Sequence, residues 1–165
     1  MKEQTELFPL VCRCATEFGG MKMAWIGQLN EESGMIVPVA SHGEGQDYLN
    51  GLAISSRADI AEGLGPTGTA LRENRAVIIN NFPADPSTMP WRARIVKYGW
   101  GSCTAFPIQR GGKPFAVLTV YHEQINAFDE EAIALLDEMT INISFALDNF
   151  DHEIQRQLAQ ESLLL

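Results

Sequence analysis

The sequence predicts a single α+β domain, and three features support this prediction. Its 165 residues fall in the roughly 100–200 residues that are typical of one domain. Two pairs of short apolar segments, each joined by a polar or Gly-rich turn, indicate antiparallel β-hairpins. A C-terminal segment without Gly or Pro, residues 129–165, predicts a long helix.

The N-terminal segment is expected to form an amphipathic helix. Its apolar residues recur at helical spacing: Leu7, Leu10, Val11, Cys14 and Phe18. Gly19 and Gly20 end the pattern. Pro9 fits such a helix only near its first turn or at a kink, because it lacks a backbone N–H.

A β-hairpin is predicted next. Residues 22–29 and 35–41 are apolar segments on either side of a polar turn. Pro38 lies in the second segment, which we therefore expect to be an edge strand, since Pro cannot donate to a neighbouring strand. A short helix is expected at 46–51.

The middle of the chain alternates predicted helices and strands. Pro66 suits the first turn of a helix and Asn74 its left-handed end. Gly111-Gly112 suits a tight hairpin turn. The expected elements are a helix at 65–74, a strand at 75–80, a helix at 91–98 and paired strands at 101–110 and 113–121.

The C-terminal helix shows a heptad-like pattern. Its apolar residues are spaced by threes and fours, with Thr140 as the interruption: Ile133, Leu136, Ile143, Leu147, Phe150 and Ile154. A helix of about 35 residues exceeds the usual globular length. We therefore expect the helix to extend beyond the domain, and the chain to be a fragment of a longer one.

The formal net charge of -9 is concentrated at one end of the chain. Residues 1–121 contain 11 acidic and 11 basic side chains, whereas residues 122–165 contain ten acidic ones and only Arg156. Residues 86–122 carry five basic side chains and no acidic one. The acidic excess argues against nucleic-acid binding, which depends on phosphate neutralisation.

The sequence also predicts a cytoplasmic protein. It has neither a signal peptide nor an apolar run long enough to span a membrane, so no membrane insertion is expected. Its three Cys match neither a disulfide framework nor a zinc motif. The isolated His42, His122 and His152 lack the spacing of a metal site, so no metal is expected.

Several motifs, in this order, resemble a GAF domain over residues 5–150. They are Gly-Pro-Thr-Gly at 65–68, Arg-Ala-Val-Ile-Ile-Asn at 75–80, the strand pair at 102–108 and 115–121, and Phe-Asp-Glu-Glu at 128–131. The chain is most similar to bacterial GAF modules attached to diguanylate cyclase (GGDEF), EAL phosphodiesterase or histidine-kinase outputs. Met-Ala-Trp-Ile at 23–26 and Ser-Phe-Ala-Leu-Asp-Asn at 144–149 carry that closer similarity.

The resemblance implies a GAF-like, PAS-related α+β fold. It has a central antiparallel sheet of five or six strands, both terminal helices on one face and small-molecule pockets on the other. Residues 1–150 would be the GAF sensor domain, and 151–165 the start of an exit helix that continues the C-terminal helix.

Departures from the family limit the ligands that the resemblance implies. Tyr121-His122 stands where cyclic-nucleotide-binding GAF domains have Asn-Lys, so cyclic GMP or AMP is not supported. No Cys is followed by His, so no covalent bilin is expected, and the cofactor, if there is one, is unknown. Cys12 and Cys14 fall on the terminal helix, which leaves Cys103 without a partner for dithiol chemistry.

The function that the resemblance implies is a non-catalytic small-molecule sensor and dimerisation module, regulating a downstream cyclase, phosphodiesterase or kinase output. The candidate ligand-binding residues are Trp91, Arg92, Trp100, Ser102, Tyr121 and Thr67. The candidate interface of a homodimer formed by the terminal helices is Leu7, Leu10, Cys14, Ile143, Leu147, Phe150 and Ile154.

Each candidate residue also has a simpler interpretation. Large aromatic side chains and a free Cys are common in cores, and Arg side chains are common on solvated surfaces. Two other functions therefore stay open: a small reductase of the methionine-sulfoxide-reductase type that uses Cys103, and a purely structural dimerisation domain.

Overall fold

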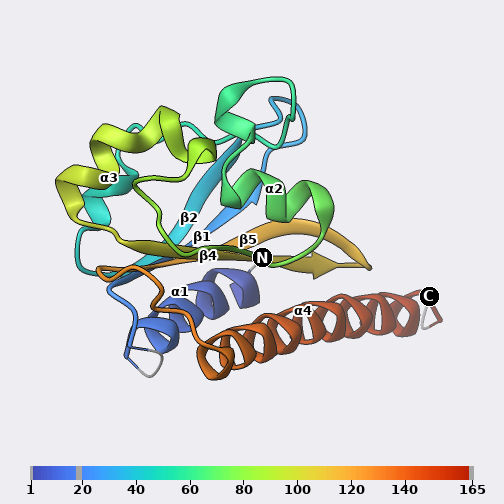
Figure 1. The fold of residues 1–165 in the computed structure, drawn as a ribbon. Coiled ribbons are helices and arrows are strands. Elements are labelled where there is room, and N and C mark those ends of the chain that lie inside the picture. The colour runs from blue at the N-terminus through green and yellow to red at the C-terminus, as the bar shows by residue number, and fades with distance from the viewer. Residues whose placement is uncertain (1, 18–19, 164–165) are drawn as a thin grey trace.

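The computed structural model describes residues 2–17 and 20–163, which form one α+β domain around a five-stranded antiparallel sheet (Figure 1). The strand order is β2-β1-β5-β4-β3. The strands are β1 (Met23–Leu29), β2 (Ile36–Gly43), β3 (Val77–Ile79), β4 (Ser102–Arg110) and β5 (Lys113–His122). The predicted fold class is confirmed, and β2 lies at a sheet edge as Pro38 predicts.

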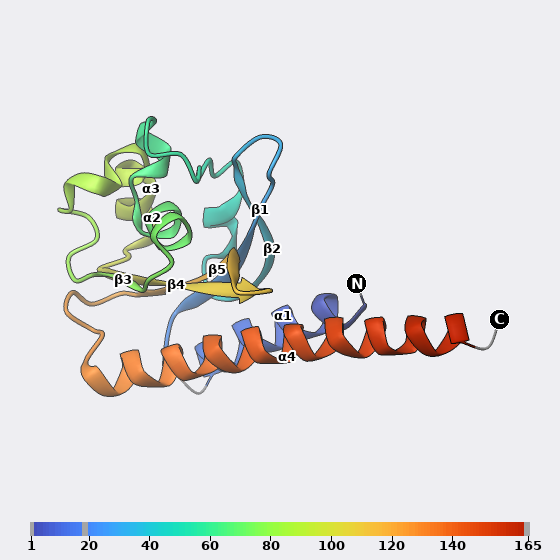
Figure 2. The ribbon, with the colours of Figure 1, turned by 90° about the vertical axis from the view of Figure 1, so that its right-hand side faces the viewer.

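The helices divide between the two faces of the sheet (Figures 1 and 2). One face, which we call the terminal-helix face, is covered by α1 (Lys2–Glu17) and α4 (Glu130–Leu163). The other, the distal face, is covered by α2 (Pro66–Glu73), α3 (Arg92–Tyr98) and the 3-10 helices η1 (Gln46–Leu49), η2 (Ala61–Gly63) and η3 (Pro86–Trp91). Both terminal helices thus share one layer, as expected.

Local sequence explains several element ends. Pro66 occupies the first turn of α2, and Asn74 ends the helix in the left-handed conformation with φ 52°. Gly111 and Gly112 have φ of 61° and 78°, which the tight turn between β4 and β5 requires. Pro38 pairs with Gly27 beside a register shift, which is the irregularity that a missing N–H favours.

Helix α1 packs on the sheet with a different side from the one its spacing predicts. The buried residues are Phe8, Val11, Cys12 and Ala15. Leu10 is 53% exposed and Cys14 is half-buried, so of the predicted stripe only Val11 is buried; Phe18 lies outside the described residues. Pro9 lies inside the helix rather than in its first turn.

Helix α4 is a single helix of 34 residues that extends well past the sheet (Figure 2). Its buried residues follow the predicted heptad pattern: Leu136, Thr140, Ile143 and Leu147. Thr140 is accommodated because its hydroxyl donates to the Asp137 carbonyl within the helix. Phe150 and Ile154 continue the stripe half-buried, and residues 155–163 are exposed.

The β4–β5 hairpin fastens α4 where the helix leaves the sheet. The Arg110 guanidinium donates from Nε and Nη2 to both carboxylate oxygens of Asp151, at 2.8 and 2.6 Å. The Gly111 N–H donates to the Asp148 carboxylate at 2.8 Å. Among the described residues, no helix is long and apolar enough to cross a membrane.

Candidate functional site

The distal core is a cluster of aromatic rings centred on Tyr121. Its ring stacks on Trp100, with ring centroids 5.4 Å apart and planes 11° apart, and on Phe82 at 5.5 Å. Tyr48 lies against the same ring at 5.3 Å. The Trp25 Nε1–H donates to the Tyr121 hydroxyl at 2.9 Å, which fixes that phenol on the sheet.

Four of the six candidate ligand-binding residues lie together on this face, and all four are buried: Thr67, Trp91, Trp100 and Tyr121. Thr67 hydrogen-bonds through its hydroxyl to that of Thr119 at 2.8 Å, joining the start of α2 to β5. Trp91 donates its Nε1–H to the Ala53 carbonyl. The polar groups of Thr67 and Trp91 thus have partners within the protein, as expected of a packed core.

Arg92 lies at the start of α3 and is half-buried. Its Nη2 donates to the Asp85 carbonyl at 3.2 Å. Its Nε is buried and has no hydrogen-bond partner among the described residues, and the same is true of Trp100 Nε1. Both donors belong to residues that were singled out as ligand-binding candidates.

Ser102 does not lie with the other candidates. It is adjacent in β4 to Cys103, whose side chain is in the distal core, and neighbouring strand residues point to opposite faces. Ser102 therefore faces the terminal-helix side, and its hydroxyl donates to the Gln124 carbonyl at 2.7 Å. The prediction places it on the wrong face, because strand alternation cannot be assigned to a face without the register.

Sequence reasoning missed Tyr48, which is 1% exposed. It lies in η1, in a stretch whose neighbours are exposed: Gln46, Asp47 and Asn50. A single Tyr among polar residues carries no periodic signal of burial. The one available signal is the large aromatic side chain itself. It lies in a segment flanked by Gly45 and Gly51, and such a segment could turn the ring inward.

Among the described residues, the distal core has no fully buried charged side chain, and Arg92 and Arg94 reach it half-buried. Burial raises the pKa of the Cys103 thiol and of the Tyr48 and Tyr121 phenols well above their ordinary values. Among the residues whose burial is described, the buried polar side chains are Ser and Thr. Cys103 thus stays protonated at neutral pH, and a thiol in that form is a poor nucleophile.

Two grooves open on the surface near α4. An apolar groove of about 390 Å³ runs between α1 and α4. It is lined by Leu7, Leu10, Val11, Cys14, Leu135, Met139, Asn142, Ile143 and Ala146. We call it the α1–α4 groove.

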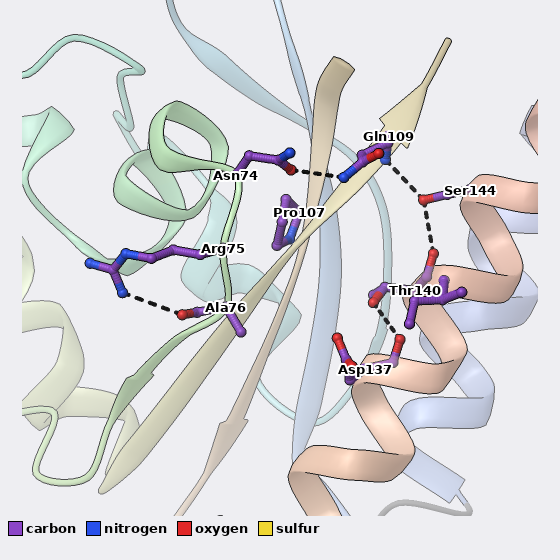
Figure 3. A pocket seen from close by; sticks show the side chains of 9 residues that line it. Asn74, Arg75, Ala76, Pro107, Gln109, Asp137, Thr140 and Ser144 are labelled. Atoms are coloured by element: carbon purple, nitrogen blue, oxygen red, sulfur yellow. Dashed lines mark hydrogen bonds between the residues drawn. The ribbon is translucent and has the colours of Figure 1, made fainter. Parts of the chain in front are cut away.

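The second groove, of about 250 Å³, is polar and lies where α2 ends beside β4 and α4 (Figure 3). Across it, Gln109 Nε2 donates to Asn74 Oδ1 at 3.0 Å, and the Gln109 N–H donates to Ser144 Oγ at 2.9 Å. Ser144 in turn donates to the Thr140 carbonyl. Two hydrogen bonds, both made by Gln109 of β4, thus connect the end of α2 on the distal face to α4 on the other face.

No group of three or more His, Cys, Asp or Glu side chains is arranged to hold a metal ion within the described part of the chain.

Comparison with known structures places the fold among diverse proteins. The GAF domain of a putative membrane protein from Geobacter sulfurreducens is 20% identical with a TM-score of 0.72, covering 88% of this chain and 93% of that one. Free methionine-R-sulfoxide reductase from Neisseria meningitidis is 18% identical with a TM-score of 0.70, covering 87% and 77%. A domain of a putative two-component sensor histidine kinase from Sinorhizobium meliloti is 15% identical with a TM-score of 0.67, covering 92% and 96%.

At such identities these likenesses concern the fold alone, and a comparison with curated proteins finds no match. The family model described as "GAF domain" matches residues 2–148, which is most of the chain. With the five-stranded sheet and the shared layer of terminal helices, this match shows that the chain belongs to the GAF domain family.

Proposed function

We propose that this GAF domain is a non-catalytic sensor module that dimerises through α1 and α4, and that it passes a change on its distal face to an output domain. The observation that supports dimerisation is the α1–α4 groove, where apolar side chains of both terminal helices are exposed to solvent. Apolar surface of this kind is typical of an interaction site. We take the occupant to be a second copy of the chain.

The groove redefines the residues of the proposed interface. Leu7, Leu10 and Cys14 line it, and so does Ile143 from its core position. Leu147 is fully buried against the sheet and cannot reach a partner, which corrects that candidate. Leu135 lines the groove in addition and is 42% exposed.

Phe150 and Ile154 extend the interface that we propose. They continue along α4 toward residues 155–163, which are exposed on all sides. Two such helices side by side would bury the apolar stripe that the sheet no longer covers there.

The proposed signal route uses the polar connection from Asn74 through Gln109 to Ser144. A ligand that favours one position of α2 would shift the population of α4 positions through it. One structural neighbour, from Geobacter sulfurreducens, is described as a GAF domain/HD domain protein, and another belongs to a sensor histidine kinase. By analogy with them we propose an enzymatic output such as a cyclase, phosphodiesterase or kinase.

The dimer is tested by placing charge in the groove. Leu10→Glu and Leu135→Glu should each weaken self-association at least tenfold in sedimentation equilibrium, because pairing would bury the new carboxylate without a partner. Val96→Glu, at an exposed site on the distal side, is the control and should leave association unchanged. A wild-type chain that is monomeric at all concentrations would contradict the proposal.

Sensing is tested by thermal shift. A molecule that binds the folded state raises the melting temperature by mass action. We expect at least one hit in a screen of small metabolites and cyclic nucleotides, and we expect Asn74→Ala to leave binding intact while it uncouples α4. A screen without any hit would leave only a structural dimerisation domain.

The reductase alternative has support from the fold alone, through neighbours such as the Neisseria enzyme. Cys103 is buried and its pKa is raised by burial, and the other two Cys lie on α1 at the opposite face. The wild-type chain is therefore expected to leave free methionine sulfoxide unreduced in the presence of a thiol reductant. Turnover that Cys103→Ser abolishes would replace our proposal with this one.

A further inference from the structure

One of the buried rings of the distal core comes from a loop. Between residues 44 and 53, Tyr48 is the one buried side chain, and Leu49 and Leu52 are half-buried. The Tyr48 ring contacts those of Tyr121 at 5.3 Å and Trp100 at 6.3 Å. The other rings of this cluster come from strands, from α3 and η3, or from the segments beside them, whereas Tyr48 comes from a four-residue 3-10 helix.

The loop that carries Tyr48 is bounded by two glycines with positive φ, Gly45 at 75° and Gly51 at 70°. The Cβ of any other residue at 45 would lie 3.1 Å from the rings of Trp100 and Tyr98, so the loop backbone sits directly on the aromatic cluster. Glycines at both ends allow the segment between them to change direction at low cost.

Polar contacts from α3 and its start hold this loop closed. Arg94 Nη1 donates to the carbonyls of Tyr48 and Asn50, at 2.5 and 2.6 Å. Trp91 Nε1 donates to the Ala53 carbonyl at 3.0 Å. The bond from Arg94 to Asn50 is exposed and the other two are part-buried, so water can replace them only when the loop opens.

The closed state leaves a donor unsatisfied. Trp100 is 4% exposed and its Nε1–H has no hydrogen-bond partner among the described residues. A buried donor without an acceptor is costly, and native structures contain few of them. A molecule that brings a hydrogen-bond acceptor into this cluster would remove that cost.

We propose that the Tyr48 ring is an intramolecular plug in a binding site for an uncharged aromatic molecule that carries a hydrogen-bond acceptor. The Tyr48 hydroxyl is hydrogen-bonded to that of Tyr121 and leaves Trp100 Nε1 without an acceptor. The ligand enters when the 45–51 loop swings out and takes the position of the Tyr48 ring. Because it is not tethered to the loop, it can turn its acceptor toward Trp100 Nε1.

We take the ligand to be uncharged because the fully buried polar side chains among the described residues are Ser or Thr, whereas Arg92 and Arg94 are only half-buried and donate to backbone carbonyls. This inference rests on the proposed sensing function and names its ligand class.

The first test removes the Tyr48 ring and measures whether free phenol binds in its place. Tyr48→Ala should have a lower melting temperature than wild type, and phenol should restore part of it, since an apolar cavity of about 150 Å³ is large enough to bind a benzene ring. Phenol should bind about fivefold more tightly than toluene, because it offers an acceptor to Trp100. Adding Trp100→Phe should reduce that preference, and the part that remains would come from the Tyr121 hydroxyl.

The matched control is Phe8→Ala, which deletes a ring of similar size from the terminal-helix core. In that variant phenol should have no advantage over toluene. Equal binding of phenol and toluene to Tyr48→Ala would overturn the role of Trp100, and so would an equal preference for phenol in both variants.

The second test keeps the ring and loosens the loop. Arg94→Ala removes the bonds to the Tyr48 and Asn50 carbonyls, so hydrogen exchange in residues 46–52 should accelerate. Apparent phenol affinity should rise severalfold, because affinity scales with the fraction of open loops. Lys97→Ala, one turn further along α3, should change neither quantity.

Unchanged phenol binding in Arg94→Ala would show Tyr48 to be an ordinary core residue, even if Tyr48→Ala binds phenol. Failure of the sensing proposal is distinguishable from this result. If a metabolite in the thermal-shift screen stabilises the chain while phenol has no effect on wild type or Arg94→Ala, sensing stands and the plug is wrong.

Discussion

The two faces of one sheet are closed in different ways. On the terminal-helix face, α1 and the 34-residue α4 cover a core of mainly aliphatic side chains with a few Phe rings, and both helices leave apolar side chains in solvent. On the distal face, short helices and loops surround a core of aromatic rings, and Phe82, Trp91, Trp100 and Tyr121 are all buried.

This difference follows from the geometry of the covering elements. A long straight helix can press only one stripe against a sheet, so a helix with a second apolar stripe must leave it exposed. Loops and short helices bend, and can turn single large side chains such as Tyr48 inward. In our proposal, the terminal-helix face therefore pairs with a second copy of the chain, and the distal face binds the ligand.

The largest expected effect is a difference in stability between the alanine variants of two leucines, one on each face of the sheet. Leu71 on α2 is 3% exposed and Leu10 on α1 is 53% exposed. Leu71→Ala should lower the free energy of unfolding by about 2–5 kcal/mol, because it leaves a cavity in the distal core. Leu10→Ala should change it by less than about 0.5 kcal/mol in the monomer.

Urea unfolding at low protein concentration measures the loss of stability in both variants. Analytical ultracentrifugation measures dimerisation, where the larger effect should come from the Leu10 variant instead. Leu10→Ala should weaken dimerisation, and Leu71→Ala should not. If both variants lost similar stability, the contrast between the faces would be wrong.

A smaller effect is expected at the fastening of α4 to the β4–β5 hairpin. The hydrogen bonds from Arg110 lower the pKa of the Asp151 carboxyl. A carboxyl whose pKa is lower in the folded chain adds stability above its unfolded pKa of about 3.9, and loses it as the pH falls through the folded value. Asp151→Asn should therefore cost up to about 1 kcal/mol at pH 7, since the pair is partly exposed.

The difference between Asp151→Asn and wild type should shrink as the pH falls below about 3.9 and vanish only below the lowered pKa of Asp151, in urea unfolding monitored by circular dichroism. Glu153→Gln is the control, because its partner Arg156 lies on the same exposed helix surface. A loss of stability in Asp151→Asn that does not depend on pH would point to packing rather than to the ion pair.

The smallest effects are differences in alkylation rate among the three Cys thiols. These thiols probe both faces of the sheet without any substitution. Burial raises the pKa of Cys12 to about 12 and that of Cys103 well above its ordinary value. Both should resist iodoacetamide at pH 8 on the time scale in which Cys14, half-buried in the α1–α4 groove, is alkylated.

Cys14 should also become less reactive as the protein concentration rises, if the groove pairs. Peptide mass spectrometry after timed alkylation distinguishes the three sites. Rapid labelling of Cys103 in the native chain would mean that the distal core opens without any ligand.

Sequence reasoning succeeded where a residue type constrains the backbone by itself. Pro66 and Asn74 placed the ends of α2, and Gly111-Gly112 placed the hairpin turn. Pro38 placed β2 at the sheet edge. In each case the constraint is local, so it needs no knowledge of the rest of the fold.

Sequence reasoning failed where the face to which a side chain points depends on the register of a strand or on the rotation of a helix about its axis. Ser102 and Cys103 are neighbours on opposite faces of β4, and only the register with β5 decides which of them faces the rings. The stripe of α1 was assigned to the wrong side in the same way, since Leu10 and Phe8 both belong to plausible apolar stripes. Tyr48 was missed because its burial depends on the long-range contacts of a loop.

Because α4 is attached to the β4–β5 hairpin at Asp151, a small tilt of the helix at that point would be amplified toward its C-terminal end. From Asp151 to Leu163 the helix runs a further 12 residues, about 18 Å at 1.5 Å per residue. A tilt of roughly 10° about the hairpin would move the far end by about 3 Å, close to the width of an atom. A shift too small to change the packing of the sheet would thus still decide which atoms meet at the tip of the helix.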